Sequence, residues 1–107
     1  MTKTVLITGA GSGLGAAFAQ RYANLGSYVV VADVNAVRAE EIRAQICAHG
    51  GQAMAVAMDI TREEDWEGLF QTLSAQNIQV DTLINNAGVA SGGPTLAADI
   101  DEWQWML

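Results

Sequence analysis

Short apolar runs alternate with amphipathic segments along the 107 residues of this chain. The apolar runs predict four strands, at residues 4–7, 27–32, 52–58 and 80–84. Between these runs, apolar side chains recur at helical spacing and predict three helices. Strands that alternate with helices pair in parallel through right-handed crossovers. The pattern therefore predicts an α/β fold with a doubly wound parallel sheet.

Polar residues predict where several helices begin. Asn35 precedes the second helix as a candidate N-cap. Thr61 and Glu64 have the spacing of a capping box ahead of the third helix. Asp99 and Glu102 predict the N-cap and the third residue of a fourth helix. The third helix carries a stripe of apolar side chains that predicts a core-facing side: Trp66, Leu69, Phe70 and Leu73.

A glycine-rich segment at residues 8–15 (Thr-Gly-Ala-Gly-Ser-Gly-Leu-Gly) joins the first strand to the first helix. Unpaired backbone N–H groups and the positive end of the helix dipole make such a turn a place where phosphate binds. The spacing Gly9, Gly13, Gly15 departs from the common G-x-G-x-x-G, because Leu14 stands where that pattern needs its third glycine. A tight strand-to-helix turn also needs glycine for purely structural reasons.

Three further polar segments follow predicted strands: Asp33, Asp59 and the run at residues 85–88 (Asn-Asn-Ala-Gly). In an open parallel sheet, ligands bind beyond the carboxyl ends of the strands. The predicted topology brings these segments and the glycine-rich turn to one edge. This convergence is the strongest sequence argument for a nucleotide site.

Asp33 stands where a carboxylate accepts hydrogen bonds from an adenosine ribose and repels a 2′-phosphate, which favours NAD over NADP. Arg38 is the nearest cation in the sequence and would weaken that preference. The alternative for Asp33 is a strand-end turn beside Asn35. Asp59 is expected to accept from the adenine amino group while Ile60 packs or offers backbone there. The alternative for Asp59 is local turn chemistry ahead of the third helix.

The run at 85–88 offers two amides and a glycine. Asn85 and Asn86 carry amides that can bond strand-end backbone and a ribose, and Gly88 would let the backbone pass close to a cofactor. A simple turn is the alternative interpretation of these residues.

Composition narrows the choice of partners. Lys and Arg number 5 against 12 Asp and Glu, a formal charge of −7, which disfavours a nucleic acid partner. Cys47 has no partner for an internal disulfide, which fits a reducing cytoplasm. The N-terminal apolar run stops at Gly9 and is too short for a signal peptide or a membrane span. No metal site is expected, because His49 has no second ligand nearby.

The glycine spacing after Thr8 and the Asn-Asn-Ala-Gly run together closely resemble the short-chain dehydrogenase/reductase family. The resemblance implies a Rossmann-type domain and an NAD(P)-dependent oxidoreductase that acts on small-molecule alcohols and ketones, commonly as a homo-oligomer. It implies that backbone of Ser12, Gly13 and Leu14 contacts the cofactor phosphates and that Asn86 lies beside the nicotinamide-side ribose. It also places Asp33 and Asp59 at the adenosine ribose and the adenine.

The chain departs from that family in its chemistry. The family uses a Tyr-x-x-x-Lys motif, but neither Tyr22 nor Tyr28 has a lysine four residues later, and Lys3 is the only lysine. No catalytic residue is therefore assigned. We expect residues 1–107 to be the N-terminal, cofactor-binding part of a longer enzyme, inactive alone, with its fourth strand left as an open edge. The alternatives are a non-catalytic dinucleotide-binding or association module, and a remnant with no independent function.

Overall fold

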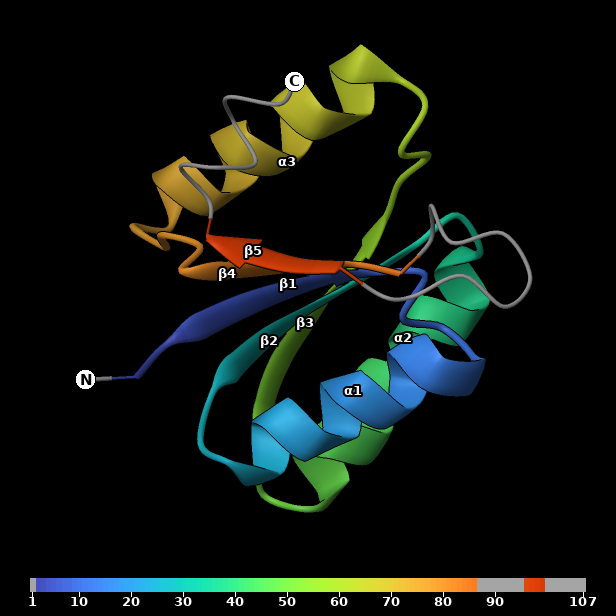
Figure 1. Ribbon diagram of the computed structural model, residues 1–107, viewed down its shortest axis with the longest axis vertical. Coiled ribbons are helices and arrows are strands. Elements are labelled where there is room, and N and C mark those ends of the chain that lie inside the picture. Colours follow the sequence, from blue (N-terminus) through green and yellow to red (C-terminus); the bar gives the residue numbers. More distant parts are fainter. Residues whose placement is uncertain (1, 87–95, 100–107) are drawn as a thin grey trace.

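A five-stranded sheet forms the centre of the computed structural model, which describes residues 2–86 and 96–99. The strands are β1 (Thr4–Thr8), β2 (Tyr28–Asp33), β3 (Gln52–Ala57), β4 (Thr82–Asn85) and β5 (Leu96–Asp99). The helices are α1 (Gly13–Asn24), α2 (Ala36–Ala48) and α3 (Glu63–Ala75). Helices α1 and α2 cover one face of the sheet and α3 covers the other (Figure 1).

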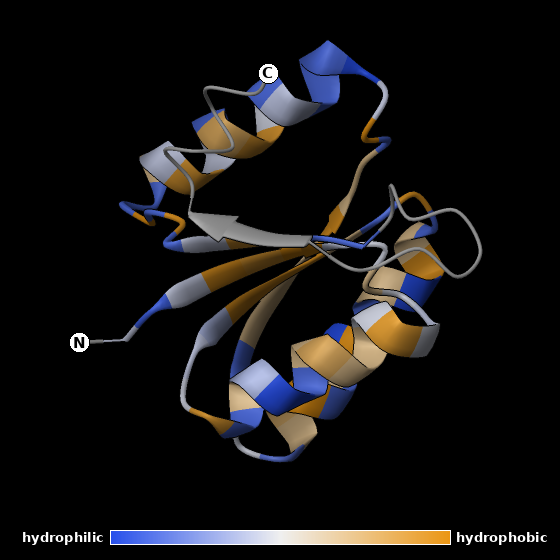
Figure 2. Ribbon diagram, viewed as in Figure 1, coloured by the Kyte–Doolittle hydropathy of each residue, from blue (hydrophilic) through white to orange (hydrophobic). Residues whose placement is uncertain are grey.

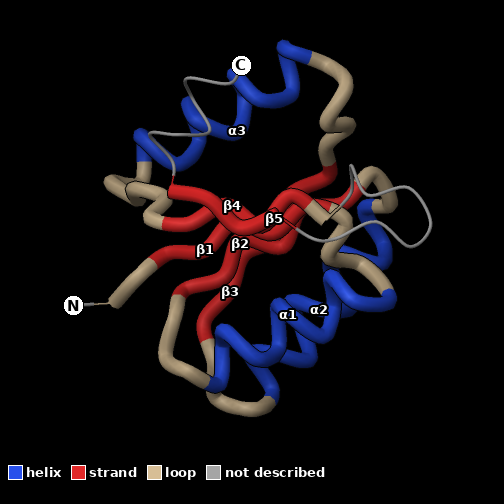
Figure 3. Tube along the Cα trace, viewed as in Figure 1, coloured by secondary structure: helices blue, strands red, loops and turns tan. Residues whose placement is uncertain are grey.

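The strand order is β3-β2-β1-β4-β5, and the four strands predicted from the sequence pair in parallel. Thr8 at the end of β1 lies opposite Ala32 of β2 and Asn85 of β4. Parallel pairing therefore gathers the strand ends. In Figure 3, the loops that follow β1, β2 and β3 lie at one edge of the sheet. The loops that lead into β2, β3 and β4 lie at the opposite edge.

Alternate side chains of β1 and β2 enter two separate cores, because successive residues of a strand point to opposite faces. Leu6 and Val30 pack toward α3, where Trp66, Leu69 and Leu73 complete one core. The other core joins both strands to α1 and α2: Val5, Ile7, Val29, Val31, Ala19, Ala39, Ile42 and Ile46. Figure 2 shows the central strands in the apolar colour, as expected for a sheet covered on both faces.

The prediction that β4 is an open edge is wrong, because β5 pairs antiparallel with it. Backbone groups of residues 96–99 satisfy that side of β4. Asp99, the predicted N-cap of a fourth helix, ends β5 opposite Thr82, and the helix after it stays a prediction. Residues 100–107, where that helix was expected, lie outside the described residues.

The capping predictions for α2 and α3 had different outcomes. Asn35 is the N-cap of α2, and its Oδ1 accepts a hydrogen bond from the Arg38 N–H at 3.2 Å. The capping box of Thr61 and Glu64 is wrong, because α3 begins after Arg62 and has no side-chain cap. The Thr61 hydroxyl donates instead to Asp59 at 2.6 Å. A carboxylate two residues away is a strong, charge-assisted acceptor for that hydroxyl hydrogen.

Candidate functional site

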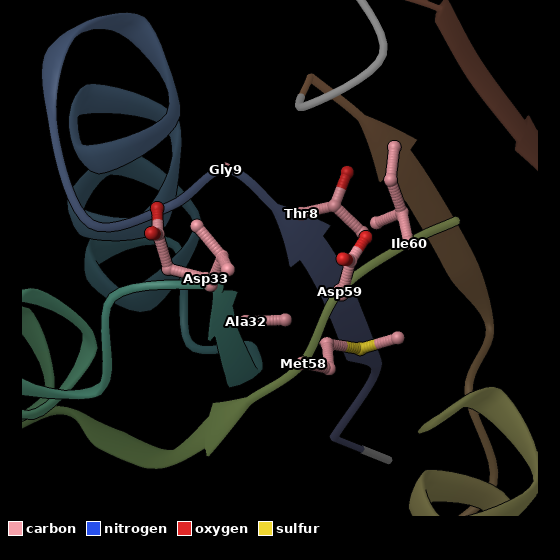
Figure 4. A pocket seen from close by; sticks show the side chains of 8 residues that line it. Thr8, Gly9, Ala32, Asp33, Met58, Asp59 and Ile60 are labelled. Atoms are coloured by element: carbon pink, nitrogen blue, oxygen red, sulfur yellow. The ribbon is translucent and has the colours of Figure 1, made fainter. Parts of the chain in front are cut away.

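A cleft of about 330 Å³ opens where β1, β2 and β3 end (Figure 4). Its lining comes from three separate segments: Thr8, Gly9, Ala32, Asp33, Val34, Met58, Asp59 and Ile60. The structure thus brings together four of the residues proposed from the sequence, namely Gly9, Asp33, Asp59 and Ile60. Small-molecule sites span roughly 300–1,000 Å³, so this cleft has room for part of a dinucleotide.

Glycine is required in the turn between β1 and α1 by close packing. A Cβ added to Gly15 would lie 2.1 Å from the Gly9 carbonyl oxygen and 2.8 Å from the Asn86 side-chain nitrogen. Gly13 has φ of 60°, a left-handed conformation that side chains disfavour, and open space where a Cβ would stand. Both glycines therefore have a structural reason. The lack of a side chain at Gly15 lets the start of α1 pack against the residue that follows β1.

The N-terminus of α1 is open to a ligand. Ser12 is the N-cap with extended backbone, but its side chain makes no capping hydrogen bond, and the first turn carries no acidic residue. Ser12, Gly13 and Leu14 are exposed, and Leu14 is 56% accessible. The first N–H groups of a helix lack partners within it. This end of α1 therefore offers N–H donors and a positive dipole to an anion.

Asp33 ties the glycine-rich turn to the start of α2. Its Oδ2 accepts from the Gly11 N–H at 2.9 Å, and its Oδ1 accepts from the Asn35 N–H at 2.8 Å. The strand-end turn weighed as the alternative for Asp33 is therefore present. It leaves the ribose role open, because a carboxylate has about four acceptor positions and these bonds fill one on each oxygen.

Asp59 closes a tight turn after β3. Its Oδ1 accepts from both the N–H and the hydroxyl of Thr61, at 2.9 and 2.6 Å. These two bonds hold the pKa of the Asp59 carboxyl below its ordinary value, the hydroxyl bond more strongly than the N–H bond. Local turn chemistry, the alternative interpretation, is thus confirmed. The Oδ2 atom takes part in neither bond.

Two residues of α3 hold this turn, and the sequence analysis missed their role. The Asp65 Oδ2 accepts from the Asp59 N–H at 2.8 Å. The Trp66 indole donates to the Ile60 carbonyl oxygen at 2.9 Å while its ring packs in the core, 8% exposed. An indole on a core stripe, six residues after Ile60, was the available signal, because a buried Trp N–H needs an acceptor.

The end of β4 is bonded to the end of β1. The Thr8 hydroxyl donates to Asn85 Oδ1 at 2.9 Å, and Asn86 Nδ2 donates to the Gly9 carbonyl oxygen at 3.3 Å. The expectation that these amides bond strand-end groups is confirmed for Asn86. Thr8 was not singled out as a site residue, although it is fully buried and lines the cleft. Gly88 lies outside the described residues.

The described part of the chain, residues 2–86 and 96–99, contains no helix long and apolar enough to cross a membrane. Within the same ranges, no three His, Cys, Asp or Glu side chains are close enough together to hold a metal ion.

Comparison with known proteins identifies the class. The family model described as short chain dehydrogenase matches residues 3–107, and the chain belongs to this family. It is 42% identical over 92 residues to 7alpha-hydroxysteroid dehydrogenase of Escherichia coli (strain K12). This match covers 86% of the chain and 35% of that relative. It is 33% identical over 101 residues to cyclopentanol dehydrogenase of Comamonas testosteroni. This match covers 94% of the chain and 40% of that relative.

Solved structures agree with the predicted fold. A crystal structure of hydroxysteroid dehydrogenase from Escherichia coli superposes with a TM-score of 0.75 at 41% identity, covering 86% of this chain and 38% of that one. A metagenomic short-chain oxidoreductase in complex with NADP gives a TM-score of 0.75 at 33% identity, covering 86% and 42%. The Rossmann-type prediction is confirmed. The chain spans less than half the length of each of these four proteins.

Proposed function

We propose that this chain is the cofactor-binding part of an NAD(P)-dependent oxidoreductase that transfers a hydride between a nicotinamide cofactor and an alcohol or ketone. The observation that carries the proposal is the cleft at the carboxyl ends of β1–β3, lined by Asp33 and Asp59 beside the uncapped start of α1. Relatives named as dehydrogenases, and similar proteins whose structures were solved in complex with NADP or NADH, support it.

The residues on this edge fit a dinucleotide. The backbone of Ser12, Gly13 and Leu14 would receive the pyrophosphate, because α1 has no capping side chain or acidic group that competes with an anion there. Gly15 supports this arrangement by letting α1 pack directly against the Gly9 carbonyl. Gly9 itself lines the cleft.

The adenosine half would lie in the cleft. Asp33 would accept hydrogen bonds from the ribose through the acceptor positions that the Gly11 and Asn35 N–H groups leave open. Asp59 would accept from the adenine amino group through Oδ2, and Ile60 would pack against the ring. Asn86, already bonded to Gly9, would lie toward the nicotinamide side.

The preferred dinucleotide is proposed to be NAD. The Asp33 carboxylate would accept from the ribose and would repel the charge of a 2′-phosphate. When bound, the nicotinamide supplies the hydride chemistry. The residues of this chain bind and orient it, and none is assigned as the proton donor. The small-molecule substrate and a homo-oligomeric state are proposed from the family resemblance, and a cytoplasmic location from the single cysteine, Cys47.

A non-catalytic dinucleotide-binding module is the second candidate, favoured by one observation, the absence of a Tyr-x-x-x-Lys motif from these 107 residues. Both candidates predict binding. The test is calorimetric titration of the folded chain with NAD, NADP and ADP-ribose, with folding checked by circular dichroism. We expect NAD and ADP-ribose to bind and NADP to bind more weakly. A folded chain that binds none of the three would overturn the proposed site.

Turnover separates the two candidates. The oxidoreductase proposal predicts that a longer protein carrying this sequence oxidises an alcohol with reduction of NAD. Such a protein that binds NAD and turns over no alcohol or ketone would favour the binding module.

A further inference from the structure

The Cβ atom of Arg38 lies beside the proposed ribose site. A Cβ built on Gly11 would lie 2.8 Å from the Arg38 Cβ and 2.8 Å from Asp33 Oδ2. The base of the arginine side chain and the carboxylate therefore meet at the same point of the glycine-rich turn. The backbone there is also fixed, because the Asn35 side chain accepts from the Arg38 N–H.

The guanidinium of Arg38 is held along α2. Its Nη1 donates to Glu41 Oε2 at 2.5 Å, three residues later on the helix. Both side chains are about half exposed, at 43% and 47%. An exposed ion pair of this kind is weak, so a competing anion can displace it.

We propose that Glu41 is a positioning residue for cofactor selectivity: by pairing with Arg38, it keeps the guanidinium from a 2′-phosphate placed at Asp33. This inference rests on the proposed function of the Asp33 site. Arginine recognises phosphate through a planar fork of donors, and Arg38 is anchored close enough to the site to take that role once released. Selectivity for NAD then has two sources, repulsion by Asp33 and the occupation of Arg38 by Glu41.

The same helix offers a matched control. Arg43 pairs with Glu40 through Nε and Nη2, also at a spacing of three residues. Arg43 lies five residues after Arg38, about 7.5 Å farther along the helix axis. The variants Glu40→Gln and Glu41→Gln remove the same charge from the same helix, but only Glu41→Gln frees the arginine that begins beside Asp33.

The test measures affinities for ADP-ribose and for its 2′-phosphate by calorimetry, in the wild-type chain and in Glu41→Gln, Glu40→Gln, Arg38→Gln and the Arg38→Gln/Glu41→Gln double variant. These ligands lack nicotinamide, so no activity is needed. We expect Glu41→Gln to raise the relative affinity for the 2′-phosphate ligand about two- to fivefold, the range that weak ion pairs allow. The ratio should stay unchanged in Glu40→Gln, and Glu41→Gln should have no effect when Arg38 is already replaced.

An unchanged ratio in Glu41→Gln would overturn the inference. So would an equal change in Glu40→Gln or in the Arg38→Gln background, since that would show a general effect of charge. In both cases the wild-type chain still binds ADP-ribose and the proposed function stands. A folded wild-type chain that binds neither ligand overturns the proposed function and this inference together.

Discussion

The two edges of the sheet use the same residue types in different ways. At the amino edge, Asp81 Oδ2 accepts from the Thr4 N–H at 2.8 Å and joins the starts of β4 and β1. Gly26 and Gly50, with φ of 92° and 87°, end the turns that follow α1 and α2. At the carboxyl edge, Asp33 also accepts a backbone N–H, from Gly11, but Asp33 lines a cleft as well.

The difference follows from helix direction. In a parallel α/β sheet, each helix begins at the carboxyl edge and ends near the amino edge. Helix starts present N–H donors and a positive dipole, whereas helix ends present carbonyl groups. Aspartate and glycine at the amino edge therefore close turns, and at the carboxyl edge they also line the cleft that we propose holds part of a dinucleotide. The following variants test this distinction.

The largest effect is expected from Gly15→Ala. The added Cβ would meet the Gly9 carbonyl oxygen at 2.1 Å, so α1 or the turn must move. Overpacking of this kind costs roughly 1–3 kcal/mol of unfolding free energy, and the displaced turn should lose dinucleotide binding. Urea unfolding and calorimetry with NAD measure the two effects.

Gly68→Ala is the matched control for this variant. Gly68 lies within α3 with nothing within 4 Å of its added Cβ. Alanine should raise stability there by about 0.5–1 kcal/mol, because glycine is unfavourable inside a helix. Equal stability of the two variants would contradict the close approach at Gly15.

Asp33→Asn and Asp81→Asn compare the two edges directly. Each removes a carboxylate that accepts a backbone N–H. Hydrogen bonds to a charged group contribute about 1.5–3 kcal/mol, so loss of the Asp33 charge should weaken NAD binding at least about tenfold. Asp81→Asn should lower stability and leave the NAD affinity within about twofold. An equal loss of affinity in both variants would show that Asp33 acts only through folding.

The sequence predicted β1 to β4 and the meeting of their carboxyl ends at one edge of the sheet. It could do so because apolar runs that alternate with helices are local patterns, and the same apolar side chains fill the two cores. It also placed Asp33 and Asp59 correctly at the cleft. It missed contacts between residues that lie far apart in the sequence. β5 is formed by backbone pairing with β4, and the bond from Thr8 to Asn85 joins residues 77 positions apart.

Trp66 illustrates a partial success. Its spacing with Leu69 and Leu73 predicts the core side of α3, and the ring is buried there. The hydrogen bond from its indole to the Ile60 carbonyl depends on how the turn after β3 approaches α3, which no periodicity encodes. The hydrophobic pattern therefore predicts where a side chain lies, and it says less about which polar atom it contacts.

Trp66→Phe should have an intermediate effect. Phenylalanine keeps an aromatic ring in the core but removes the donor to the Ile60 carbonyl. An unsatisfied acceptor costs about 1–3 kcal/mol, and a looser turn should weaken ADP-ribose binding about two- to tenfold. Phe70→Leu is the control, because Phe70 stacks on Trp66 with ring centroids 6.3 Å apart and does not line the cleft. A similar loss of binding in Phe70→Leu would attribute the effect to core packing.

The smallest effect is expected from Thr61→Val. The Thr61 hydroxyl is the main cause of the lowered pKa of Asp59, so its removal should raise that pKa toward its ordinary value, visible in an NMR titration of the Asp59 carboxyl. Because the folded-state pKa is the lower one, this bond adds stability above the unfolded value of about 4 and loses it as the pH falls through the folded-state pKa. The stability gap between wild type and Thr61→Val should therefore narrow on acidification. Thr72→Val, which removes a hydroxyl bonded to the Gly68 carbonyl, should leave the titration of Asp59 unchanged. A gap that widens in acid would contradict this assignment.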